Sequence, residues 1–456
     1  MNDTYPRADN PLVAMERLFS SKYGLVKVAA LENRLNRLEI FTKTTKYTMG
    51  NLIPMFLVTV ESSKNFTDDR RIIGGGTALT YERSKIKAFG EFIERYCGMY
   101  TKQDYLSSII FDSYENLVKN GISCLDLTDL IPFKDNLYAT PNFPFSRYCT
   151  QSPISWIKGE NLISGESVWL PAQKVFLSYP FPAKELYHAY SLSTGLACGS
   201  NFYQAALGAI LEVIERDSFM LMWLFKRPGR QIKIDHIQNE ALKKLYHHIE
   251  KHLVGEDQLF MYDISETNGV YTIFTFIRND LPKAYGLVVA AASHPSPEIA
   301  LLKALEELCH TQYFAYSRLG NDQEKTYQRL KKEDVDTLHK HFFYYSNSRH
   351  NHKIDFISAT KEWVFLSAMT DYSKNTDQEN FAYLKDLFQR EKQPIYMADL
   401  TKPEIRTSGF QVLKAIIPNY VDLVPSHHYM DQKNNRVRYY QQKYQSPLND
   451  NPHPFP

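Results

Sequence analysis

Cysteine is scarce in this sequence of 456 residues, and the few cysteines are scattered along the chain. No pair has the C-x-x-C spacing of a zinc or redox site, and their number is odd. These features argue against a disulfide framework and favour a reducing compartment. The five are Cys97, Cys124, Cys149, Cys198 and Cys309. Cys198 lies in a glycine-rich stretch, yet no feature beside it indicates a nucleophile.

Long apolar runs are also lacking. No stretch reaches the roughly 18 apolar residues of a membrane helix, and the first residues lack the apolar core of a signal peptide. We therefore expect a soluble, cytoplasmic protein without a membrane span. Neither sign of charge is in excess, since 53 basic residues face 51 acidic ones. A dedicated nucleic-acid binder usually has a basic excess, so that class is disfavoured.

Several common motifs of catalysis are missing. The sequence contains no Walker A stretch, no G-x-G-x-x-G after a strand and no G-x-S-x-G elbow. The histidine pairs at 247–248 and 427–428 lack zinc spacing and are interpreted as surface residues. Hydrophobic residues make up 43% of the chain, which at this length suffices for a large core.

What the sequence does contain is a repeated acidic motif. "GEFIERYCGM" at 90–99 and "LEVIERDSFM" at 211–220 both carry Glu-x-x-Glu-Arg inside an apolar run. On a helix, positions i and i+3 share a face, so each copy projects two carboxylates together. Burying such a pair is costly unless a cation compensates. Arg95 and Arg216 could supply that charge, and so could Mg²⁺, which prefers hard carboxylate oxygens.

One copy of this motif would most simply be a solvated, salt-bridged helix face. Two copies, each in an apolar helix after a glycine-rich stretch, favour two elements that face one site. The glycines of "GGGT" and "STGLACGS" would let backbone approach phosphate closely, and helix N-termini favour anions.

Local patterns predict the surrounding elements. Alternation in 22–62 predicts strands, the triple glycine at 74–76 predicts a loop, and Glu82 to Tyr100 reads as a helix. Residues 154–177 predict a hairpin around a Ser-Gly turn. Strand-like runs occupy 259–292.

A third helix is expected to open at Ser296-Pro297 and to carry Glu306, Glu307 and His310. Taken alone, that acidic pair reads as an ordinary helix surface.

The chain ends in "PHPFP", which places prolines at alternate positions. Pro452, Pro454 and Pro456 enforce an extended conformation without backbone donors. A disordered tail is the usual alternative at a terminus. A stiff strand loses little entropy on docking, which favours a tail that binds back onto the protein.

Together these segments resemble the YcaO family, and in particular the D-type cyclodehydratase subunits of ribosomal peptide pathways that make thiazoles and oxazoles. The resemblance runs from about Leu18 to the end of the chain. It rests on "KAFGEFIERYCG", "STGLACGSNFYQAALGAILEVIERD", "KALEEL", "ADLTKPEIRTSGFQVLKAIIPNYVDL" and "PHPFP".

The resemblance implies an α/β (α+β) YcaO fold, with pseudo-repeated strand and acidic-helix units around a central ATP and Mg²⁺ site. It implies a strand-rich N-terminal region over 1–60, a catalytic domain over 61–440, and a tail over 441–456 that reaches the active site. The carboxylates that match the family's metal ligands are Glu91, Glu94, Glu212 and Glu215. The positions expected to contact nucleotide are Ser200, Gln204, Arg95, Arg216, Glu307, His310 and Lys414.

The sequence departs from the family pattern at three places. Lys87 stands where the first motif usually begins with serine. The glycine stretch lacks the basic residue often found there. His310 replaces the glutamine of the third motif, Glu-x-x-Gln. None of these changes removes a carboxylate.

The implied activity is conversion of Cys, Ser or Thr of a precursor peptide to thiazoline or oxazoline, as in bacteriocin biosynthesis. The side chain attacks the preceding amide carbonyl, and ATP phosphorylates the amide oxygen so that it leaves as phosphate. We expect the three tail prolines to act at the reacting centre, with the Pro456 carboxylate orienting the amide or accepting a proton.

The expected partners are the precursor peptide, a leader-binding C-type protein related to ubiquitin-activating enzymes or to ocin-ThiF proteins, and a flavin azoline dehydrogenase. The family also suggests a homodimer. Two alternatives stay open. One is thioamide or amidine formation by the same ATP chemistry. The other is a non-catalytic scaffold that binds peptide and partner.

Overall fold

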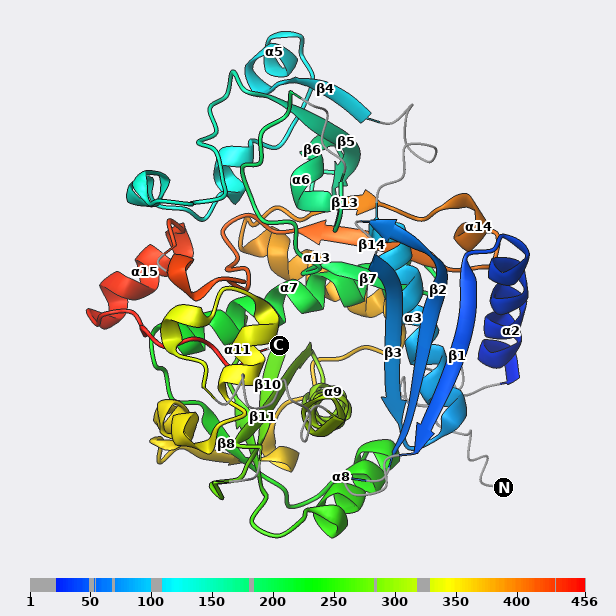
Figure 1. The fold of residues 1–456 in the computed structure, drawn as a ribbon, viewed down its shortest axis with the longest axis vertical. Helices are drawn as coiled ribbons and strands as arrows, with labels where there is room; N and C mark the ends of the chain where they lie inside the picture. Colours follow the sequence, from blue (N-terminus) through cyan, green and yellow to red (C-terminus); the bar gives the residue numbers. More distant parts are fainter. Residues whose placement is uncertain are drawn as a thin grey trace, which may run out of the picture.

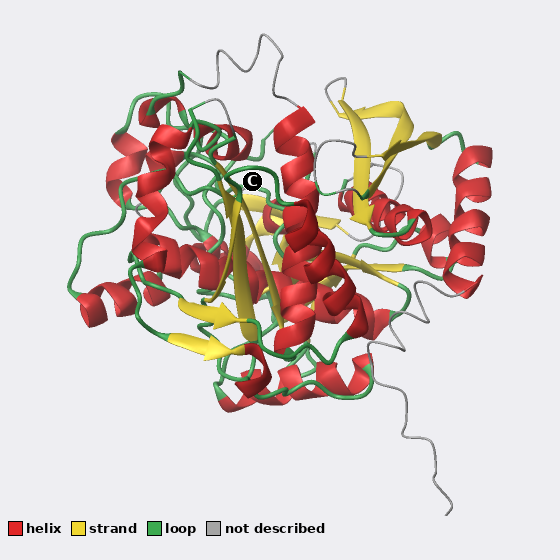
Figure 2. Cartoon of the chain, turned by 90° about the horizontal axis from the view of Figure 1, so that it is seen from below, coloured by secondary structure: helices red, strands yellow, loops and turns green. Residues whose placement is uncertain are grey.

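The computed structural model of the chain describes residues 22–48, 53, 55–67, 70–99, 109–179, 184–282, 285–317, 329–430 and 432–455. Its strands form three separate sheets, with helices packed on and between them (Figures 1 and 2). Only β8 and β12 pair in parallel among the described strands, and all other pairs are antiparallel. This mixed architecture confirms the predicted fold class.

The smallest sheet has the order β1-β2-β3. Its strands are Phe41–Thr48, Phe56–Thr67 and Arg70–Ala78. Helix α2 (Lys22–Arg37) precedes it, and helix α3 (Tyr81–Gly98) follows. The prediction of strands throughout 22–62 was wrong for α2. There Val28, Leu31 and Leu35 are buried at the three- and four-residue spacing of a helix, which outweighs the short alternation.

The second sheet has the order β11-β10-β9-β8-β12. Its strands are β8 (Arg230–Lys233), β9 (Gln258–Asp263), β10 (Tyr271–Arg278), β11 (Leu287–His294) and β12 (Trp363–Phe365). Every residue of β11 is buried, because helix α9 covers one face and helix α7 the other. Strands in 259–292 were therefore predicted correctly.

The third sheet has the order β4-β5-β13-β14-β7, and β6 also pairs with β5. Its strands are β4 (Ile109–Ser113), β5 (Pro153–Asn161), β6 (Ser167–Pro171), β7 (Leu196–Gly199), β13 (Tyr396–Asp399) and β14 (Gln411–Ile416). The predicted hairpin is β5–β6, and Gly165 has a φ of 76° in its turn.

Helices fill the spaces between the sheets. The other helices are α5 (Tyr114–Lys119), α6 (Ala172–Val175), α7 (Phe202–Leu224), α8 (Glu240–His252), α9 (Pro297–Ser317), α11 (Leu338–Tyr344), α12 (Asp355–Ser358), α13 (Asp377–Arg390), α14 (Pro403–Arg406) and α15 (Asn435–Tyr444). Helix α9 begins at Pro297, as predicted. Among the described helices, none is long and apolar enough to cross a membrane.

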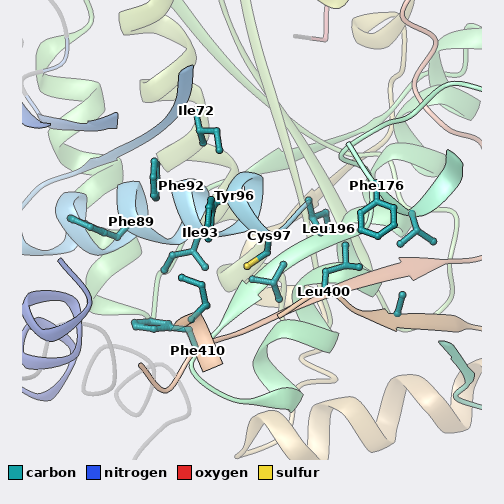
Figure 3. Close-up of a cluster of buried hydrophobic side chains, with 14 of the residues drawn as sticks. Ile72, Phe89, Phe92, Ile93, Tyr96, Cys97, Phe176, Leu196, Leu400 and Phe410 are labelled. Carbon is teal, nitrogen blue, oxygen red and sulfur yellow. The ribbon is translucent and has the colours of Figure 1, made fainter. Parts of the chain in front are cut away.

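The third sheet lies between α3 on one face and α7 with α13 on the other. Figure 3 shows Phe89, Ile93 and Cys97 of α3 packed with Leu196 of β7 and with Phe410. The boundary expected after residue 60 falls inside β2, and that after residue 440 falls inside α15.

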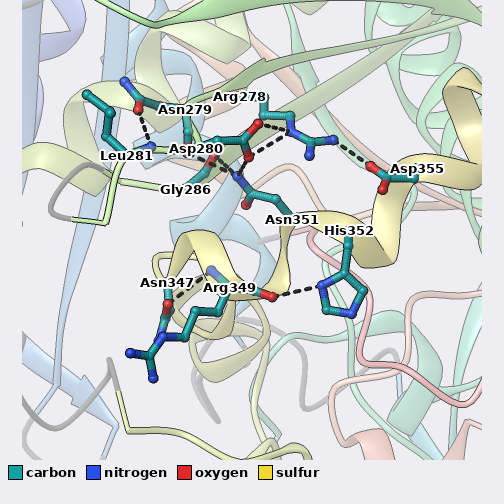
Figure 4. A network of polar contacts seen from close by, with 10 residues as sticks. All are labelled: Arg278, Asn279, Asp280, Leu281, Gly286, Asn347, Arg349, Asn351, His352 and Asp355. Carbon is teal, nitrogen blue, oxygen red and sulfur yellow. Dashed lines mark hydrogen bonds and ion pairs between the residues drawn. The ribbon is translucent and has the colours of Figure 1, made fainter.

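A polar network joins the ends of β10 and β11 to Asn351 and Asp355 (Figure 4). The Asn351 amide donates to the carbonyl oxygens of Asn279 and Gly286 at 3.0 and 3.1 Å and to Asp280 at 2.8 Å. Arg278 bridges Asp280 and Asp355. These contacts close the turn between β10 and β11, at the end of β11 opposite to the one that leads into α9.

Candidate active site

Three units, each an edge strand followed by a helix, surround one cavity of about 520 Å³. They are β3–α3, β7–α7 and β11–α9, and each strand is the last in its sheet. The residues lining the cavity include Gly75, Gly76, Thr77, Arg83, Lys87, Gly90, Glu91, Glu94, Cys198, Glu212, Glu215, Arg216, Ala291, Ala292, Lys303, Glu306, Glu307 and His310. The two copies of Glu-x-x-Glu-Arg thus face one site.

The first glutamate of each motif is held in the same way. Glu91 accepts a hydrogen bond from the Gly75 N–H at 2.5 Å and pairs with Arg95 at 2.5 Å. Glu212 accepts one from the Gly195 N–H at 3.0 Å and lies 3.5 Å from Arg216. In both units a glycine N–H from the preceding segment and the arginine one helical turn later orient the carboxylate.

The triple glycine at 74–76 is not the loop that the sequence predicted. Gly74, Gly75 and Gly76 are part of β3, and Gly199 ends β7. A Cβ on Gly74 would lie 2.4 Å from the Ala88 carbonyl oxygen, so the glycines allow the strand to touch the backbone of α3. Their observed role is close packing and support of the glutamates, rather than an open phosphate loop.

Burial makes three carboxylates of the site, Glu94, Glu212 and Glu215, hard to ionise. Desolvation, followed by the charge of Glu212, raises the pKa of Glu94 well above its ordinary value. Desolvation also raises the pKa of Glu212, and it raises that of Glu215 to about 8 despite the nearby guanidinium of Arg216. Six carboxylates and four cationic side chains line the cavity, which leaves a formal excess of two negative charges.

This donor set fits Mg²⁺. The described part of the chain has no group of three or more His, Cys, Asp or Glu side chains already converged on one point. Mg²⁺ binds through one or two carboxylates and completes its shell with water and substrate phosphates, so a closed protein cage is not required. The four glutamates would hold the ion, and the charge of the ion would relieve the repulsion between them.

Of the positions predicted to contact nucleotide, some line the cavity and others do not. Arg216, Glu307 and His310 line the cavity, and His310 points at Gly75, where a Cβ would lie 3.1 Å from its Nε2. Arg95 is nearly half exposed at the flank. The remaining three do not line this cavity and are described next.

Ser200 and Gln204 cap the start of α7, since the Ser200 N–H donates to the Gln204 side-chain oxygen at 2.7 Å. The Gln204 amide nitrogen is buried and has no hydrogen-bond partner among the described residues. Lys414 is buried and donates to the carbonyl oxygens of Leu192 and Thr194 at 2.7 and 2.6 Å. It lines a separate, smaller cavity beside β14.

The proline tail turns inward from α15 and reaches α7 (Figure 1). Pro452 and Pro454 are buried, and the ring of Phe455 lies 4.3 Å beneath the Arg216 guanidinium. The Tyr345 hydroxyl donates to the Pro452 carbonyl oxygen at 2.6 Å. Pro456 lies outside the described residues.

Sequence reasoning gave no site role to Arg83, Lys303 and Glu306, all of which line the cavity. The signal for Arg83 was present, because it lies one turn before Lys87 and two before Glu91 on α3. Glu306 carried no such signal, since its cationic partners come from a helix more than two hundred residues earlier. All five cysteines are free, and burial followed by the charge of Glu94 raises the pKa of Cys198 well above its ordinary value.

The chain is similar to several solved structures, at identities that show the fold alone. A heterocyclase in complex with substrate and cofactor matches with a TM-score of 0.68 and 16% identity, over 87% of this chain and 52% of that one. The YcaO protein of Methanopyrus kandleri, bound with AMPPCP and Mg²⁺, matches with a TM-score of 0.62 and 17% identity, over 87% and 91%. The E. coli microcin synthetase McbBCD complex with bound pro-MccB17 matches with a TM-score of 0.55 and 14% identity, over 91% and 96%.

One curated relative, an uncharacterized protein of Methanothermobacter thermautotrophicus, is 24% identical over 59% of this chain and 66% of its own length. The chain spans about half the length of the heterocyclase with substrate and cofactor. The family model described as YcaO cyclodehydratase, ATP- and Mg²⁺-binding, matches residues 75–421. That match starts within β3 and includes α3, β7–α7 and β11–α9. This chain belongs to the YcaO cyclodehydratase family.

Proposed function

We propose that this protein is an ATP- and Mg²⁺-dependent cyclodehydratase that converts Cys, Ser or Thr of a ribosomal precursor peptide to thiazoline or oxazoline. The observation that carries the proposal is the matched support of Glu91 and Glu212 across one cavity. The heterocyclase neighbour was solved with substrate and cofactor, and the Methanopyrus kandleri neighbour with AMPPCP and Mg²⁺. Both support ATP chemistry at this cavity.

The protein's own contribution is positioning and charge neutralisation. Glu91, Glu94, Glu212 and Glu215 would hold Mg²⁺ between α3 and α7. When bound, the nucleotide supplies the phosphoryl group that makes the amide oxygen of the peptide a good leaving group. Glu307 and His310 face the same space from α9. Cys198 keeps its proton because of burial, so we assign it no covalent step.

The remaining predicted positions are proposed in supporting roles. Ser200 and Gln204 would contact nucleotide at the start of α7, where the Gln204 amide nitrogen lacks a partner. Lys414 holds the segment that leads to Gly195 and so supports Glu212 indirectly. Phe455 stacks on Arg216, and we propose that the proline tail, Pro456 included, borders the reacting amide.

We also propose a separate C-type partner protein that presents the leader of the peptide, a flavin dehydrogenase that oxidises azolines, and a homodimeric assembly. The microcin synthetase neighbour was solved as a multiprotein complex with its pro-peptide, which supports the first of these proposals.

The decisive experiment incubates the protein with ATP, Mg²⁺, its partner protein and the precursor peptide encoded beside its gene. We expect loss of one water mass per ring formed, whereas thioamide formation would exchange oxygen for sulfur. Glu212→Gln should lower turnover by at least roughly a hundredfold, because an amide is a poor Mg²⁺ ligand. Lys85→Gln on α3, whose lysine pairs with Glu32 away from the cavity lining, serves as the control. Undiminished processing by Glu212→Gln would favour a scaffold and contradict the proposal.

A further inference from the structure

Beside the glutamate quartet, the cavity contains a second charged cluster formed by Arg83, Lys87 and Glu306. The Lys87 ammonium lies 3.2 Å from one Glu306 carboxylate oxygen, and Arg83 lies 2.9 Å from the other. The Glu306 side chain is only 9% exposed, so this ion pair is largely out of water. Burial alone would raise the pKa of Glu306, but Lys87 and Arg83 lower it below its ordinary value.

The cluster is continuous with the proposed metal site. Arg83, Lys87 and Glu91 follow each other at four-residue intervals along α3, so they lie on one stripe of the helix. Glu306 and Lys303 project from α9 into the same cavity. Two guanidinium or ammonium groups against one carboxylate leave this end of the cavity positive, whereas the quartet end is negative.

Lys87 is placed to contact a bound ligand. An ammonium has three donors, and its described contacts use two of them, with Glu306 and with the Thr77 carbonyl oxygen at 3.3 Å. One third of its side chain is exposed, and it lines the cavity. Glu306 and Thr77 therefore hold the ammonium at the cavity wall with a donor still available.

We propose that Lys87, held in place by Glu306, is an additional contact for the phosphate groups of the nucleotide in this protein. The inference rests on the proposed function. It accounts for a lysine at the position where the family pattern has serine, and for a buried carboxylate that no metal ligand role requires. Arg83 shares Glu306 and reinforces the positive end of the cavity.

The test is equilibrium binding of adenosine, AMP, ADP and ATP to the full chain with Mg²⁺, measured by titration calorimetry. Lys87→Met should weaken ATP binding by about tenfold, as expected for loss of one charge-assisted hydrogen bond. The loss should shrink as phosphates are removed and vanish with adenosine. Lys87→Arg should stay within about threefold of the wild-type affinity, because it keeps the charge.

A matched control is Lys85→Met. Lys85 lies two residues away on the same helix and pairs with Glu32 at 2.7 Å, so its loss should leave every nucleotide affinity unchanged. The double variant Lys87→Met with Glu306→Gln separates ligand contact from simple charge balance. If Lys87 only neutralised Glu306, the double variant would regain wild-type ATP affinity, and that recovery would overturn the proposal. We expect the ATP affinity of the double variant to stay about tenfold weaker than that of the wild type.

Failure of this inference is distinguishable from failure of the proposed function. If wild-type protein binds no ATP in the presence of Mg²⁺, both are wrong. The assignment of Lys87 alone is wrong under a different set of results. In that case wild-type protein binds ATP, Glu212→Gln abolishes this binding, and Lys87→Met leaves the ATP affinity unchanged. Thermal unfolding of each variant shows whether it is folded. If Lys87→Met is not folded, Lys87→Arg and the double variant still test the inference.

Discussion

At the scale of single residues, the site is governed by how each carboxylate is supported. Glu91 and Glu212 each accept a glycine N–H and face an arginine of their own motif. The second glutamates are supported less well, and desolvation is the largest influence on Glu94 and Glu215. Ionising the second carboxylate of each motif is therefore costly, and a divalent cation bound there would stabilise the ionised form.

This asymmetry predicts a pH dependence for the metal-free protein. Burial raises the pKa of Glu215 from 4.5 to about 8. Between these values the folded state binds more protons than the unfolded state, so the stability from this group is present below pH 4.5 and is lost as pH rises through 8. We expect the melting temperature of the wild type to fall more steeply from pH 5 to 8 than that of Glu215→Gln.

The same residue predicts how Mg²⁺ should act. The ion binds the deprotonated carboxylate, so added Mg²⁺ should raise the melting temperature more at pH 8 than at pH 6. The measurement is thermal unfolding with and without Mg²⁺ in a low-salt buffer series. Parallel pH profiles for wild type and Glu215→Gln would show that Glu215 does not titrate in this window.

At the scale of elements, the site depends on strands that allow helices to approach closely. A Cβ on Gly76 would lie 2.3 Å from the Ser84 carbonyl oxygen, and one on Gly74 would lie 2.4 Å from the Phe92 nitrogen. These neighbours are backbone atoms of α3 and cannot move independently of the helix. Glycine is therefore required here for packing, since neither residue has a positive φ.

Gly74→Ala should accordingly destabilise the protein by about 3 kcal/mol, because the added methyl forces β3 and α3 apart. Urea unfolding monitored by circular dichroism measures the change. Gly90→Ala is the matched control on α3, where a Cβ meets nothing within 4 Å. That substitution should stabilise the helix by up to about 1 kcal/mol. Equal effects of the two substitutions would contradict the close-packing explanation.

At the scale of the whole molecule, three sheets each contribute an edge strand to one cavity, and the tail packs behind it. Phe455 is buried against Phe219, with ring centroids 4.6 Å apart, and stacks on Arg216. The Trp223 indole donates to the Asn451 carbonyl oxygen at 3.0 Å. The last residues of the chain thus complete the core around α7 and contact the arginine that faces Glu212 and Glu215.

Phe455→Ala should lower the free energy of unfolding by about 3 kcal/mol, as for other buried aromatic truncations. It should also speed amide exchange in the tail, for example at the Asn449 N–H that donates to the Leu224 carbonyl oxygen. Asp450→Asn is the control, because Asp450 pairs with Lys332 at an exposed position, where ion pairs contribute at most about 1 kcal/mol. Unchanged stability and tail exchange in Phe455→Ala would contradict the docked tail.

The sequence by itself determined the elements whose signals are local. Ser296-Pro297 opens α9, Gly165 turns the β5–β6 hairpin, and the spacing of each Glu-x-x-Glu-Arg motif places its carboxylates on one helical face. Side-chain periodicity and turn chemistry act within a few residues, so they can be interpreted without knowing the neighbours.

Only the tertiary structure decided which segments meet. It placed the glycines of 74–76 in a strand, joined Glu306 to Lys87, and brought Phe455 to Arg216. Each of these outcomes depends on contact between residues far apart in the chain, and steric fit and desolvation arise only when those segments pack together. A local pattern does not indicate such distant partners. The acidic motif could therefore be recognised from the sequence, whereas the cluster of Arg83 and Lys87 around Glu306 could not.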